Sequence, residues 1–120
     1  MRFSQNSRKL WTALIVAAFG LSIMSTAGAS YNANLTGTVT YLSQYEGGIF
    51  MFELSNQPAS NGSCNATQFE IDPANNTDAV MARMYARLVA AYYTQQPIGI
   101  GYDNAGSCGT NGYIHVYVVG

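Results

Sequence analysis

The stretch DAVMARMYARLVAAYYTQQPIGIGY, residues 78–102, decides the fold class of this chain. Its first part, residues 78–94, carries apolar side chains at helical spacing, which form one stripe: Met81, Met84, Tyr85, Leu88 and Tyr92. Thr77 or Asn76 can cap such a helix. Residues 98–102 then alternate large apolar side chains with glycine, which predicts a strand whose bare face can lie close to another group. The stretch therefore predicts a helix with one buried face, followed directly by a strand.

Four further strands are predicted around this unit. Residues 35–41 alternate apolar side chains with threonine, and residues 49–54 are apolar on both faces except at Glu53, which indicates a central strand. A glycine-containing turn joins these two into a hairpin. Residues 67–71 and 113–119 supply the remaining strands. The order β-β-β-α-β-β predicts a mainly β protein with one helix (α+β), arranged as a five-stranded barrel like the oligonucleotide/oligosaccharide-binding (OB) fold.

The N-terminal segment has the layout of a secretory signal peptide. Arg2, Arg8 and Lys9 precede an apolar run, and small residues follow it up to Ala29. The apolar run at residues 10–24 is shorter than the roughly twenty residues that span a bilayer. We expect cleavage after Ala29, with an uncleaved anchor as the alternative. The chain then divides into a signal peptide at 1–29 and a single OB-like domain at 30–120, located in the periplasm or secreted.

The predicted domain is acidic. Residues 30–120 hold two arginines against six carboxylates, hence a net charge of −4. Nucleic-acid binding requires clustered lysine and arginine to displace counterions from phosphates, and this segment has no such cluster. We therefore expect no nucleic-acid partner and, after cleavage, no stable membrane span.

Cys64 and Cys108 are the only cysteines of a chain that is expected to leave the reducing cytosol. Their expected fate is one disulfide, from the start of the third strand to the loop at residues 103–112, and two free thiols are the alternative. His115 is the only histidine, so a metal site would lack ligands. No metal site and no cofactor are predicted.

The sequence offers little for catalysis. His115 is the only candidate for a Ser–His–acid arrangement, and it falls in the middle of a predicted strand. Glu70 and Asp72 lie two residues apart and so share a strand face. A glycosidase could use two such acids, but we expect them to be solvated in a domain without a deep cleft. The prediction is that the protein has no catalytic residues and is not an enzyme.

Tyrosine is abundant, with nine residues, all of them after residue 30. Its ring and hydroxyl suit stacking on sugars or packing at protein interfaces. Tyr85 and Tyr92 are expected in the core, and Tyr102, Tyr113 and Tyr117 are the candidates for exposure. The alternative is that these tyrosines are ordinary strand residues.

Three segments carry a resemblance to a known family: LVAAYYTQQPIGIGY at 88–102, TGTV at 36–39 and FMFE at 50–53. They resemble the B subunit of subtilase cytotoxin and its pertussis-like relatives, and also a wider set of small secreted bacterial proteins. The resemblance spans most of residues 35–118. It implies an OB-fold barrel, assembly into a ring, and binding of glycans that end in sialic acid.

The resemblance also implies site residues. Thr36 takes the place of a hydroxyl-bearing serine, Tyr102 that of a tyrosine beside the sugar, and Glu53 is a looser match. The family's polar residue in the strand after the helix is replaced here by Gly99. We therefore expect a secreted, non-catalytic binding module for a cell-surface glycan, assembled as a homo-oligomer. The alternative is a periplasmic or secreted protein-interaction or inhibitor domain whose partner is an envelope protein.

Overall fold

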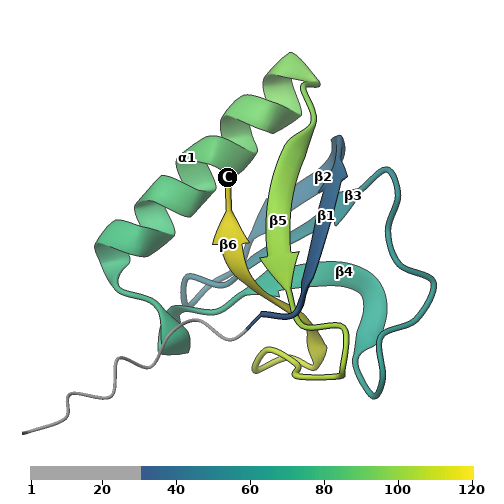
Figure 1. Ribbon diagram of the computed structural model, residues 1–120. Coiled ribbons are helices and arrows are strands. Elements are labelled where there is room, and N and C mark those ends of the chain that lie inside the picture. The colour runs from purple at the N-terminus through teal and green to yellow at the C-terminus, as the bar shows by residue number, and fades with distance from the viewer. Residues whose placement is uncertain (1–30) are drawn as a thin grey trace, which may run out of the picture.

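The computed structural model describes residues 31–120, in which one mixed sheet packs against a single α-helix (Figure 1). The predicted signal peptide at 1–29 lies outside the described residues. The six strands run in the order β1-β5-β6-β4-β3-β2 across the sheet. The elements are β1 (Ala33–Gly37), β2 (Val39–Gln44), β3 (Phe50–Leu54), β4 (Asn65–Ile71), the 3-10 turn η1 (Pro73–Asn75), α1 (Asp78–Thr94), β5 (Ile98–Tyr102) and β6 (Tyr113–Val119).

The helix α1 begins and ends where the sequence predicts. The Thr77 hydroxyl caps it by accepting a hydrogen bond from the Val80 amide at 3.3 Å. Its buried residues are Met81, Met84, Leu88 and Ala91. Tyr92 was expected in the core but is 37% exposed, because Ala91 occupies the last buried position of the stripe. Within residues 31–120 no helix has both the length and the apolarity that crossing a membrane needs.

The prediction of a closed five-stranded barrel is wrong, because the first strand is divided in two. Thr38 separates β1 from β2; β1 pairs with β5, whereas β2 pairs with β3 at the other end of the sheet. The period-two pattern of the sequence continues through this break and hides it. The result is an open six-stranded sheet, curved strongly enough for its two outer strands to be joined by one residue. The side-chain amide of Asn56 donates to the Thr36 carbonyl at 2.9 Å and supports this junction.

The central position predicted for residues 49–54 is confirmed, since β3 lies between β2 and β4. The core forms on the face of the sheet that meets α1, which Figure 1 shows lying obliquely along the sheet. Its fully buried side chains include Phe52, Phe69 and Leu88. On the opposite face, β5 is bare as predicted: a Cβ at Gly101 would lie 2.9 Å from the ring of Tyr31.

The predicted disulfide is confirmed. Cys64 immediately precedes β4, and Cys108 lies in the loop between β5 and β6. Their Cα atoms are 5.4 Å apart, well within the range that a disulfide spans. The bond therefore fastens the 103–112 loop to the start of β4, an interior strand of the sheet.

Candidate binding surface on the outer face of the sheet

The face of the sheet that points away from the core carries a row of functional side chains. Strand pairing places Ser43 opposite Met51, Met51 opposite Glu70, and Glu70 opposite His115. Because directly paired residues project to the same side of a sheet, these four side chains share one face. We call it the outer face. Tyr41, which pairs with Glu53, belongs to the same face.

The outer face contains a hollow of about 140 Å³, lined by Tyr45, Met51, Asn111 and Tyr113. Met51 is buried and forms the floor. Tyr45 comes from the turn between β2 and β3, whereas Asn111 comes from the loop that precedes β6. Two connections that are distant in sequence therefore enclose it. We call this site the tyrosine hollow.

Polar groups border the tyrosine hollow. The hydroxyls of Tyr41 and Ser43 are hydrogen-bonded to each other, and this contact lowers the pKa of Tyr41. The hydrogen bond between Tyr41 and Tyr45 raises the pKa of Tyr45. Beside them, the Gln68 amide donates to the Glu53 carboxylate at 3.0 Å. Aromatic rings, hydroxyls, an amide and a carboxylate thus meet on a few neighbouring positions of the sheet.

Glu70 holds one side of the tyrosine hollow in place. Its carboxylate is fully buried and accepts hydrogen bonds from the backbone amides of Asn111 at 3.1 Å and Tyr113 at 3.4 Å. The loop passes so close that a Cβ at Gly109 would lie 2.4 Å from the Glu70 carboxyl carbon. The expectation that Glu70 is solvated is wrong, because the disulfide-bonded loop folds back over β4 and covers it.

Asp72, also expected in solvent, is buried for the same reason. Its carboxylate accepts from the backbone amides of Thr110 at 3.0 Å and Ala74 at 2.8 Å, and from the Thr110 hydroxyl. One oxygen therefore binds the 103–112 loop and the other caps η1. Both carboxylates therefore hold backbone segments in place.

His115 lies beside these acids, is 3% exposed, and meets the Tyr117 ring edge to face with 4.3 Å between ring centroids. Burial lowers the pKa of its imidazole, while the Asp72 and Glu70 carboxylates act in the opposite direction. Its Nδ1 atom has no hydrogen-bond partner in the described part of the chain. Among residues 31–120 no group of three or more His, Cys, Asp or Glu side chains could hold a metal ion.

The structure does not bring the three residues implied by the family resemblance into one site. Thr36 is exposed and pairs with Gly99, whereas Tyr102 pairs with Ala33 three positions along β1, so their side chains point to opposite faces. Tyr102, expected to be exposed, is only 9% exposed and packs edge-on against Phe69. Glu53 alone borders the tyrosine hollow.

Sequence reasoning singled out Tyr113 of the tyrosine hollow but not Tyr45, Met51 or Asn111. The sequence did hold a signal for Tyr45 and Met51, which both belong to the predicted hairpin. When its two strands are paired across the glycine turn, Tyr41 and Tyr45 lie on the same face of the sheet as Met51. No local signal marks Asn111. It reaches the hollow only because Glu70 and the disulfide hold its loop against the sheet.

Comparison of the chain with known proteins provides no relative. No protein-family model, no curated protein and no solved structure matches it. The function is therefore inferred from the residues and their geometry.

Proposed function

We propose that this chain is an exported, non-catalytic binding module and that the tyrosine hollow holds a glycan. The observation that carries the proposal is that Tyr45 and Tyr113 both line the hollow, with Met51 as its floor. The polar groups of Tyr41 and Glu53 lie on the same face of the sheet. A sugar has apolar ring faces and hydroxyl edges. Tyrosine matches both, because its ring packs on the apolar face and its hydroxyl bonds to the edge.

The place of the hollow in the fold supports the same function. In OB folds, oligosaccharides bind on the second and third strands between the loops that follow the first and fourth strands. Here β3 and β4 lie between the 45–49 turn and the 103–112 loop, which are the equivalent connections. The resemblance to toxin B subunits points to glycans as well.

The burial of the acidic groups supports a non-catalytic role. Glu70, Asp72 and His115 are all buried, and the carboxylates already accept hydrogen bonds from loop amides. The hollow is also smaller than the roughly 300 Å³ and more that enclosed small-molecule sites occupy. It suits recognition of one terminal sugar at the surface. Weak single-site binding gains avidity in an oligomer, so homo-oligomeric assembly belongs to this proposal.

A glycan array probed with the labelled chain tests this function. Tyr45→Ala and Tyr113→Ala should each weaken binding to the glycans retained by the native chain by about tenfold or more, which corresponds to 1.4 kcal/mol. Tyr93→Ala, at the exposed end of α1, is the matched control and should bind like the native chain. Absence of any retained glycan, or equal binding by all three variants, would refute the proposal.

A second candidate function rests on a different patch. Tyr93 is 80% exposed and meets the exposed Tyr92 edge to face, with ring centroids 5.7 Å apart, at the end of α1. Exposed tyrosines without a pocket suit a protein interface, and the partner would be an envelope protein. Capture from envelope extract should lose one specific protein with Tyr93→Ser but not with Tyr45→Ala. Equal recovery by both variants would reject this candidate.

A further inference from the structure

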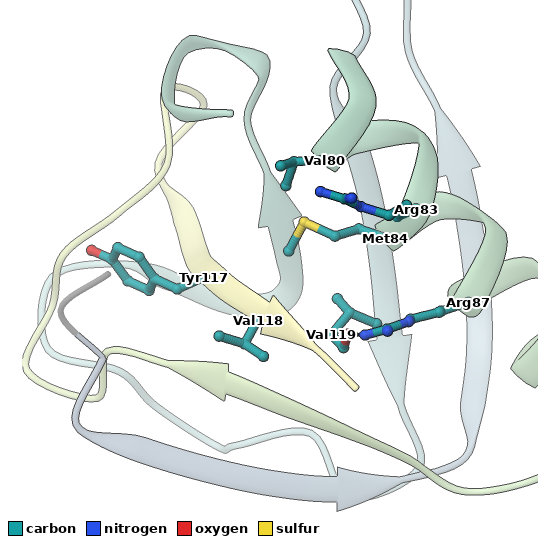
Figure 2. A pocket seen from close by; sticks show the side chains of 7 residues that line it. All are labelled: Val80, Arg83, Met84, Arg87, Tyr117, Val118 and Val119. Carbon is teal, nitrogen blue, oxygen red and sulfur yellow. Dashed lines mark hydrogen bonds between the residues drawn. The ribbon is translucent and has the colours of Figure 1, made fainter. Parts of the chain in front are cut away.

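A second hollow, of about 170 Å³, lies between α1 and the end of β6 (Figure 2). Its apolar wall comes from Val80 and Met84 of α1 and from Val118 and Val119 of β6. It shares no lining residue with the tyrosine hollow. We call it the arginine groove, because Arg83 and Arg87 complete its lining.

Arg83 and Arg87 are the only cationic side chains of residues 31–120, apart from any charge on His115, and both line this groove. Figure 2 shows both extending from α1 toward β6. Like charges four residues apart on a helix repel each other, at a cost of about 0.2–0.5 kcal/mol. No carboxylate lines the groove to offset this repulsion, although the domain carries six of them. Both guanidinium groups are exposed, so a ligand that carries a negative charge can reach them from solvent.

Arg87 is already oriented for such a ligand. One of its terminal nitrogens donates to the Val119 carbonyl at 2.5 Å. A guanidinium group has five N–H donors in a planar fork, so this bond fixes the side chain and leaves donors for a ligand. Arg83 lies one helical turn away on the same side. The two guanidinium groups and the apolar wall beside them together form an amphipathic site.

We propose that the arginine groove binds a small carboxylate that carries a short apolar group. The carboxylate bonds to Arg83 and Arg87, since guanidinium forks match carboxylate geometry. The apolar group packs on Met84 and on Val118, whose side chain is exposed. The volume admits only a short chain. Inorganic phosphate also binds arginine but makes no contact with the apolar wall. Binding in the groove therefore needs both the carboxylate and the apolar group of the ligand.

Titration with hexanoate, followed by nuclear magnetic resonance of the methionine methyl groups and backbone amides, tests the proposal. The Met84 methyl and the Val118 amide should shift saturably. Hexanamide, the neutral equivalent, and inorganic phosphate should each bind at least about tenfold more weakly. Hexanamide binding as well as hexanoate, phosphate binding as well as hexanoate, or no saturable shift would each overturn the proposal.

Variants locate the site. Arg83→Gln should weaken hexanoate binding by about tenfold or more, because it removes one charge-assisted contact. Asp78→Asn, on the same helix but outside the groove, is the matched control and should leave the affinity unchanged. Tyr45→Ala should also leave it unchanged, which separates this site from the tyrosine hollow. The Arg83 side chain is exposed, so we expect Arg83→Gln to fold like the native chain. An unchanged affinity in this variant would remove the groove as the site.

Discussion

Replacing the buried Glu70 by glutamine should destabilise the fold and loosen the tyrosine hollow together. The carboxylate accepts hydrogen bonds from the Asn111 and Tyr113 amides, both charge-assisted. The glutamine side chain has the same shape but no charge, and an NH₂ donor replaces one of the two acceptor oxygens. Hydrogen bonds to charged groups contribute about 1.5–3 kcal/mol each. Since glutamine keeps one acceptor, we expect the free energy of unfolding to fall by about 1.5–3 kcal/mol.

The measurement is urea and thermal unfolding with the disulfide intact. For a domain of this size each kcal/mol lowers Tm by about 4–8 °C. Glu46→Gln, which changes an exposed carboxylate, is the control and should stay within about 0.5 kcal/mol of the native chain. Amide exchange of Asn111 should accelerate in Glu70→Gln alone. Native stability together with native protection of the Asn111 amide would refute the role assigned to this carboxylate.

Three further predictions concern the same loop and its neighbours. Cys64→Ser with Cys108→Ser opens a link across 44 residues and should lower the free energy of unfolding by about 4 kcal/mol, as urea unfolding would reveal; a loss below about 1 kcal/mol would contradict it. Gly109→Ala should cost about 1–3 kcal/mol in the same assay, because its Cβ meets the Glu70 carboxyl group, and a neutral effect would show that the loop lies elsewhere. The pKa of His115, read from the one histidine resonance, should lie below 6.5 because burial disfavours the charged imidazole. The neutral form then stabilises the fold fully above pH 6.5, and this contribution declines as the pH falls below that value; His115→Gln should flatten the decline, and a pKa above 6.5 would reverse its sign.

Features that depend on local spacing could be predicted from the sequence. The helix at 78–94 is encoded by apolar spacing and by the Thr77 cap, both of which act within a few residues. The disulfide followed from there being only two cysteines in a chain with a predicted export signal. Strand positions were right to within a few residues except at Thr38, where alternation continues through the break between β1 and β2.

Features that depend on distant segments could not be predicted in this way. Glu70 alternates with apolar neighbours, which is typical of a solvated strand face, and only the folded-back loop buries it. The inward orientation of Tyr102 could have been predicted, because Tyr102 shares a strand face with Ile98 and Ile100, both of which lie in the core. Its place beside the last two predicted strands favoured exposure instead, and the family resemblance agreed with that expectation. Tyr45 and Asn111 lie too far apart in sequence for any local pattern to join them in one hollow.

The division of the first strand has a consequence for the order of assembly during biogenesis. β2 finds its partner β3 across a short turn, whereas β1 pairs only with β5, so that Leu35 must meet Ile100. Closing so long a loop is entropically costly and slows folding. Although β1 comes first in the chain, it therefore docks late. We expect the Leu35 amide to be among the last of the sheet to gain protection from hydrogen exchange in a pulse-labelled refolding experiment.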